Sequence, residues 1–352
     1  MDSVMDSEMG IATAPMDTAL LRRLLDDAGK QDPEYGGGLS NHLPMALLAL
    51  ARLGAGEARL RDYAASYAAA KGLVPARHPE AWPAGDAWAA RLGRRSAWPV
   101  YLDLFRQWIF HEGAAVVLSQ ALPALMPGVA AAAFHGLIRT AAGVQAGHEG
   151  EVAQGLAHWA AWHQPLGSLG PQPPQPQRRQ PQRPQPDPAV LLRRLPAGTS
   201  RAGLITGRIK AAAQGGEVSA TAALLLIDEG TPERLARAAA LAYAQTGNFT
   251  ALHLVTSTHA MRVLARFIDE GDERQAAWRW FWQAYAHGVV AARLQVADTP
   301  LVLQPWPELV SVALAARDEH LIKLVDAARE EERRYGGDDW RRAASRAVMS
   351  QR

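Results

Sequence analysis

The sequence of 352 residues predicts an all-α protein built as a large, multi-helix domain of the bundle type. Alanine is the dominant residue type and β-branched residues are sparse, a composition that favours helices. Apolar residues recur at helical spacing along most of the chain, and no convincing run of alternating strands occurs. No segment repeats at a fixed period, which argues against a solenoid.

Six segments of the first half have helical periodicity. In residues 16–29, four leucines lie on one face and charged residues on the opposite face. Residues 40–56 have a capping residue at the start, Pro44 in the first turn and Gly54 as a stop signal. The pattern continues in residues 57–72, 98–113, 131–147 and 149–163.

A segment rich in proline, glutamine and arginine divides the chain. Residues 171–188 contain eight prolines and six glutamines, and such a segment forms an extended linker or surface loop. Five more helical segments follow it, at 200–214, 232–247, 249–271, 273–294 and 307–334. The expected organisation is a disordered tail (1–15), a helical part (16–165), a linker or loop (166–190) and a second helical part packed on the first (191–352).

Composition excludes several classes of function. The absence of cysteine rules out disulfides, thiolate metal sites and cysteine nucleophiles. Outside residues 171–188, basic and acidic side chains number 34 each, so we expect no nucleic-acid partner. The first fifteen residues lack the features of a signal peptide, and the apolar stretches are too short to span a bilayer. A cytoplasmic protein without membrane contact is expected. No hydrolase, zinc-protease or nucleotide-binding motif occurs.

Several of the eleven histidines stand in apolar helical segments. A buried imidazole costs free energy unless a partner satisfies it, and a metal ion reached from several helices is one such partner. Without thiolates, imidazole ligands suit iron, copper, zinc or nickel. For each histidine the alternative is an ordinary hydrogen-bonded core residue. The histidines concerned are His42, His135, His253, His259 and His320.

Lys323 is one of only four lysines in a chain with 33 arginines. It follows His320 by one helical turn in DEHLIKL, so both side chains lie on one face. Lysine, unlike arginine, can lose its proton when buried. Its neutral amine can act as a base, or can react with carbon dioxide to form a carbamate that ligates a metal. The alternative is a lysine that extends from an amphipathic helix towards solvent.

Four motifs resemble the questin oxidase-like family: YGGGLSNHLPMALLAL, AFHGLIRTA, LHLVTSTHAMR and EHLIKL. They span about residues 20 to 335. Fungal members of this family open anthraquinone-type rings, and some are linked to NADPH. The resemblance implies an all-helical fold and a non-haem metal centre of His42, His135, His259 and His320, with Lys323 as a carbamate ligand. His253 competes with His259 for the third place.

The sequence and the resemblance together suggest an iron-dependent oxidoreductase. It would use dioxygen to oxidise or cleave a ring of an aromatic, quinone-like substrate, with NADPH only as an external reductant and with neither flavin nor haem. Lys323, Arg139 and Arg262 are candidate catalytic residues, although the two arginines can equally form structural salt bridges. Trp280, Trp282 and Tyr285 are candidate substrate-binding residues, or else helix-packing core. A zinc-dependent hydrolase and a non-catalytic helical scaffold are the alternatives.

Overall fold

The computed structural model describes residues 18–76, 88–170, 187–198, 203–294 and 300–351. These residues form sixteen α-helices and one short two-stranded hairpin, which confirms the all-α prediction. The tail at 1–15 and the proline-rich residues 171–186 lie outside the described residues. None of the described helices combines the length and the apolar character needed to cross a membrane.

Seven helices and the hairpin come from the first part of the chain. The hairpin pairs Tyr35 with Leu39 and Glu34 with Ser40 around Gly36–Gly38, three glycines with positive φ. The elements are α1 (Thr18–Ala28), β1 (Glu34–Tyr35), β2 (Leu39–Ser40), α2 (Leu43–Leu53), α3 (Glu57–Lys71), α4 (Trp98–Glu112), α5 (Ala114–Leu125), α6 (His135–Ala146) and α7 (Glu149–Ala161).

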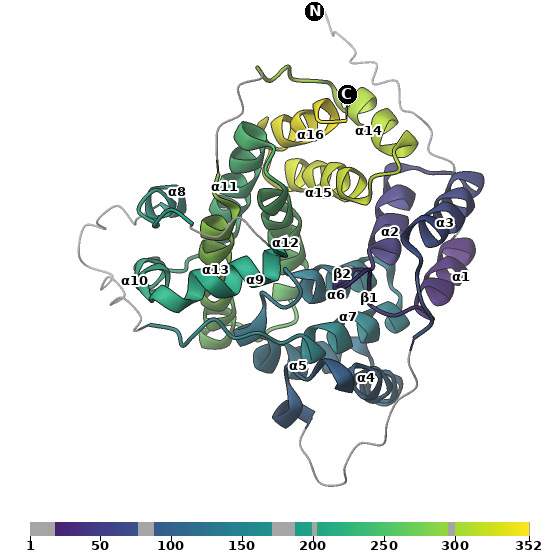
Figure 1. Ribbon diagram of the computed structural model, residues 1–352, viewed down its shortest axis with the longest axis horizontal. Coiled ribbons are helices and arrows are strands. Elements are labelled where there is room, and N and C mark those ends of the chain that lie inside the picture. The colour runs from purple at the N-terminus through teal and green to yellow at the C-terminus, as the bar shows by residue number, and fades with distance from the viewer. Residues whose placement is uncertain (1–17, 77–87, 171–186, 199–202, 295–299, 352) are drawn as a thin grey trace, which may run out of the picture.

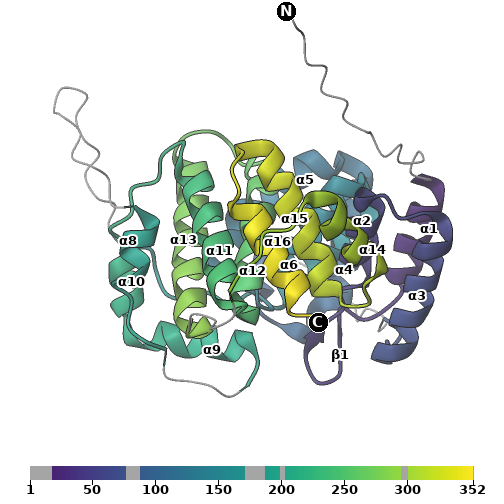
Figure 2. The ribbon, with the colours of Figure 1, turned by 90° about the horizontal axis from the view of Figure 1, so that it is seen from above.

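The second part of the chain supplies nine helices. They are α8 (Pro188–Leu192), α9 (Ile205–Ala212), α10 (Glu217–Ala222), α11 (Thr231–Thr246), α12 (Phe249–Ala265), α13 (Asp272–Ala292), α14 (Trp306–Ala315), α15 (Glu319–Tyr335) and α16 (Asp339–Met349). In both ribbon views, α8 and α10 lie at one end of the molecule and α1 and α3 at the other (Figures 1 and 2). One continuous hydrophobic core contains residues from Leu21 to Val348, so both parts contribute to it.

Helices α2, α6, α12 and α15 pack against one another in the middle of the fold (Figure 1). Every residue of α2 except Arg52 is buried, and so is nearly all of α12. A helix that is apolar on all sides can be stable only inside a protein, which explains this central position. These four helices carry the histidine-containing motifs of the sequence.

Two predicted boundaries differ from the structure. The segment 307–334 forms two helices, because the chain is extended at Ala316 and the Asp318 side chain accepts a hydrogen bond (2.8 Å) from the amide of His320. The linker expected at 166–190 ends earlier in the structure, because α8 begins at Pro188. The Asp187 side chain caps this helix by accepting a hydrogen bond from the amide of Ala189. Helices α5, α8, α10 and α16 were not predicted.

A left-handed turn leads into α6. Ala132, Ala133 and Phe134 have φ values of 47°, 56° and 69°, in a region that residues with a side chain rarely adopt. This conformation costs roughly 1–2 kcal/mol per residue, so the surrounding packing must hold it. The turn directly precedes His135 and determines where that imidazole lies.

Candidate metal centre

Four imidazoles from four different helices form one group. His42 precedes α2, His135 begins α6, His253 lies in the second turn of α12, and His320 lies in the first turn of α15. The ring centroids of His42 lie 4.6 Å from those of both His135 and His320. His253 lies 5.1 Å from His135 and 5.4 Å from His320. The N-terminal ends of four helices therefore bring the four rings together.

The surroundings of each ring fix which nitrogen points into the group. The Nδ1 atom of His135 donates to the Ala132 carbonyl, and that of His253 donates to the Phe249 carbonyl at 2.8 Å. The Nδ1 atom of His320 lies 3.4 Å from the Asp318 carboxylate. With Nδ1 protonated, the Nε2 atom of each neutral ring carries a lone pair, and in His135 this lone pair faces His42 Nε2 at hydrogen-bonding distance.

These lone pairs fit a metal cation. The Nε2 atoms of His42 and His135 lie 2.6 Å apart, and the Nε2 atom of His320 is buried without a hydrogen-bond partner in the described part of the chain. One ligand nitrogen from each of His42, His253 and His320 lies within 4.8 Å of the other two. Metal-bound histidines usually donate a hydrogen bond from the remote ring nitrogen to a carbonyl or carboxylate oxygen, which fixes the ring orientation.

Burial keeps the imidazoles in the form that binds metals. It lowers the pKa of His42, His135 and His253 well below the usual value, and neighbouring positive charge, including that of Lys323, lowers the pKa of each further. The pKa of His320 is also lowered by burial, against the opposing carboxylate of Asp318. Neutral imidazoles are ready to ligate without first losing a proton.

Lys323 lies behind this group, one turn after His320 on α15. Its side chain is 5 % exposed, and burial lowers its pKa to about 8, against the carboxylates of Glu319 and Asp318. Its Nζ atom makes no hydrogen bond or ion pair within the described ranges. A buried amine without a partner is the state in which lysine is most easily deprotonated.

All four imidazoles line one open cavity of about 270 Å³. The hairpin, the left-handed turn and the first residues of α9, α12 and α15 form its wall. Three apolar side chains of this wall are unusually exposed, with Leu39, Leu204 and Phe249 between 44 % and 52 % accessible. Exposed apolar surface around a cavity is typical of a binding site for an apolar molecule.

Lys71 and Glu319 add a charged pair to this wall. The Lys71 Nζ atom donates to Glu319 Oε1 at 3.0 Å and lies over the Tyr67 ring, 5.4 Å from its centroid. The same carboxylate atom lies 3.5 Å from His42 Nδ1 and 3.9 Å from His320 Nδ1. The sequence patterns point to neither residue, although the rarity of lysine that marks Lys323 also marks Lys71.

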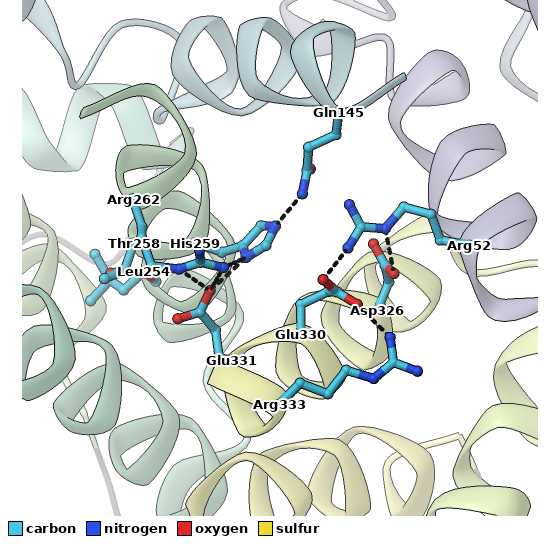
Figure 3. Close-up of polar contacts among 10 residues, drawn as sticks. All are labelled: Arg52, Gln145, Leu254, Thr258, His259, Arg262, Asp326, Glu330, Glu331 and Arg333. Carbon is cyan, nitrogen blue, oxygen red and sulfur yellow. Dashed lines mark hydrogen bonds and ion pairs between the residues drawn. The ribbon is translucent and has the colours of Figure 1, made fainter. Parts of the chain in front are cut away.

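His259 lies outside the imidazole group, and His253 lies within it. The family resemblance implies His259 for the third place and keeps His253 as the alternate. Six residues separate the two on α12, so they lie about 120° apart around the helix axis. Figure 3 shows His259 between Gln145 and Glu331, at 3.0 Å from the Gln145 amide and 2.6 Å from the carboxylate. The structure therefore places His259 on another face of α12, outside the imidazole group.

The two candidate catalytic arginines are held in ion pairs away from the cavity. Arg139 makes a bidentate pair with Glu151 at 2.8 and 2.9 Å, and both side chains are buried. Arg262 donates to Glu331 at 2.7 Å. Neither arginine is among the residues that line the cavity, so the geometry fits the structural interpretation of both.

The aromatic residues proposed as substrate-binding are part of the core. Trp282 is buried and its indole N–H donates to the Ala222 carbonyl at 2.8 Å, while Tyr285 is fully buried beside Leu235. Trp280 packs against the same core from a half-buried position. None of the three lines the imidazole cavity, whose aromatic wall is made by Tyr35 and Phe249.

His158, which lies on α7 outside the imidazole group, makes stability depend on pH. Burial, reinforced by the charge of Arg139, lowers its pKa from 6.5 to about 3. The unfolded chain therefore binds a proton before the folded protein does. Stability falls as the pH decreases through this window, by about 1.4 kcal/mol per pH unit.

Replacing His158 by glutamine removes this pH-dependent contribution to the unfolding free energy. Between pH 6.5 and 4.5, the wild type should lose about 2 kcal/mol more unfolding free energy than His158→Gln, measured in urea. Equal losses in the two proteins would mean that His158 is protonated, or accessible to solvent, in the folded state.

The comparisons with known proteins agree with the motifs. The family model described as Questin oxidase-like matches residues 39–328, a range that contains the four imidazoles and Lys323. A search of curated proteins found no match. Because the family model matches most of the chain, this protein belongs to the questin oxidase-like family.

Proposed function

We propose that this protein is a non-haem iron-dependent oxidoreductase that uses dioxygen to oxidise or cleave a ring of an aromatic, quinone-like substrate of the polyketide type. The observation that carries the proposal is the group of four imidazoles, from four helices, that lines a cavity with an apolar rim. Membership of the questin oxidase-like family supports the class of reaction and of substrate.

The residues that would hold iron are His42, His135, His253 and His320, with Lys323 as a carbamate to supply an anionic oxygen. Imidazole and carboxylate-type donors without thiolates suit non-haem iron. When bound, iron supplies the redox chemistry that activates dioxygen, which protein side chains cannot provide. NADPH would act as an external reductant, since the chain has no nucleotide-binding motif.

The chain itself would bind and orient the substrate. Leu39, Leu204 and Phe249 offer apolar surface to a flat ring at the mouth of the cavity. Lys71 has N–H groups beyond the one that it donates to Glu319, and these can donate to a quinone or phenol oxygen. The cavity volume is near the lower end of small-molecule sites, roughly 300–1,000 Å³, which favours a compact ring system.

Metal analysis of matched variants tests the proposal. Protein purified without added metal should contain about one iron per chain. His253→Ala should lose most of this iron, whereas His259→Ala should keep it, because the two histidines lie on different faces of the same helix. His320→Ala should behave like His253→Ala, with helicity unchanged by circular dichroism.

Other outcomes would reject the proposal. One zinc per chain would favour the hydrolase, because zinc accepts the same imidazole donors. Protein that is folded and free of metal would favour a non-catalytic scaffold. Equal iron content in His253→Ala and His259→Ala would show that the iron is bound elsewhere.

A further inference from the structure

A second, smaller cavity lies between the same four helices, further along each of them. Its volume is about 40 Å³. It is open towards the surface near Ala142, Gln145 and Asp326, which are half-buried. The residues that line it are Met45, Leu48, Ala49, Ile138, Ala141, Ala142, Gln145, Thr256, His259, Ala260, Lys323, Asp326 and Ala327.

The inner wall of this rear cavity is the layer directly behind the imidazoles. Its members Met45, Ile138, Thr256 and Lys323 each follow one of the four histidines by three residues. Residues at this spacing lie on one face of a helix, about 4.5 Å apart along its axis. The rear cavity is therefore separated from the imidazole group by a single layer of side chains.

Four of the five polar residues of the rear cavity are engaged by protein partners, whereas the Lys323 Nζ atom makes no hydrogen bond or ion pair in the described part of the chain. His259 is held between Gln145 and Glu331, and Arg52 Nε donates to Asp326 at 3.1 Å (Figure 3). The hydroxyl of Thr256 donates to the backbone of its own helix. A trapped water needs two to four polar partners, and eight of the thirteen lining residues are apolar. The largely apolar wall therefore offers contact surface to a small neutral molecule.

The two cavities also differ in size. The front cavity of about 270 Å³ accepts a ring system, whereas about 40 Å³ accepts a molecule of two or three atoms. An organic substrate seated in the front cavity would cover the imidazoles from that side. A second route from the opposite end of the four helices would remain open to a small reactant.

We propose that the rear cavity is a binding site and point of access for dioxygen, separate from the front cavity that takes the organic substrate. The role of dioxygen rests on the proposed function, whereas the affinity of the cavity for small neutral molecules does not. Met45, Ile138, Thr256 and Lys323 would form the gate between this site and the imidazoles.

Xenon binding and a plugged cavity test the proposal. Crystals of the full chain under xenon pressure should show xenon between Ile138, Thr256 and Ala260. Ala142→Leu, at the outer end, should abolish that xenon site and raise the KM for dioxygen about fivefold or more, with the KM for the organic substrate unchanged. Ala146→Leu, one turn further along α6 and outside the cavity wall, is the matched control and should change neither.

Leu204→Trp is the reciprocal variant, because Leu204 lies at the rim of the front cavity. It should raise the KM for the organic substrate and leave that for dioxygen unchanged. Ordered water in place of xenon, or an unchanged dioxygen KM in Ala142→Leu, would overturn the proposal. If the wild-type protein binds xenon but consumes no dioxygen, the proposed function is refuted. The same result would still support the affinity of the rear cavity for small neutral molecules.

Discussion

Replacing Lys323 by arginine should reduce dioxygen uptake with a quinone-like test substrate by about 100-fold or more, the loss expected for a group that takes part in the reaction. Arginine keeps the positive charge but can neither lose its proton nor form a carbamate. The site offers a lysine a way to become neutral, since burial lowers the pKa of Lys323 to about 8. Steady-state dioxygen uptake and iron content should be measured on the same preparations.

Lys323→Met is the control for folding. Methionine has a similar length without a charge, so the variant should fold with normal helicity and should also be inactive. If Lys323→Arg or Lys323→Met retained wild-type activity, the lysine would have only a packing role. Loss of iron in both variants would show in addition that the Lys323 side chain contributes to metal binding.

Replacing Arg139 by alanine should destabilise the protein by about 3–5 kcal/mol, because it leaves the Glu151 carboxylate buried without its counter-ion. Both side chains are within a few per cent of complete burial, and their hydrogen bonds are bidentate. The double variant Arg139→Met with Glu151→Leu should recover most of this loss, since neither charge remains. Urea denaturation measures all three proteins.

Activity distinguishes this structural role from the catalytic role that the sequence allows. Each Arg139 variant should have normal activity per folded, iron-loaded molecule. A stable Arg139→Ala protein without activity would contradict the structural role and would place Arg139 in the reaction.

Helical periodicity was sufficient to locate most of the central helices, because each carries apolar residues at a regular spacing. The four histidines of the imidazole group were also recognisable, as imidazoles in otherwise apolar segments. The sequence could not decide between His253 and His259, because α12 is buried on almost all sides. An apolar helix carries no signal in its sequence about which face meets which neighbour.

Other parts of the site depend on contacts between distant residues. The left-handed turn at Ala132–Phe134 is made of residue types that prefer right-handed conformations, so only the tertiary packing reveals it. Lys71 and Glu319 are 248 positions apart, and their pairing depends on how α3 approaches α15. Aromatic content around Trp280 suggested a binding wall, yet the same residues serve equally well as core.

The position of Glu319 has a consequence for energetics. One carboxylate oxygen contacts Lys71 at the mouth of the cavity and faces the remote nitrogens of His42 and His320. A ligand that draws Lys71 away from Glu319 changes the field at those imidazoles, and a cation at the imidazoles changes how strongly Glu319 holds Lys71. By thermodynamic reciprocity, each binding event alters the affinity of the other by the same factor. We therefore expect the binding of the proposed substrate and of the proposed metal to be coupled through this single acidic side chain.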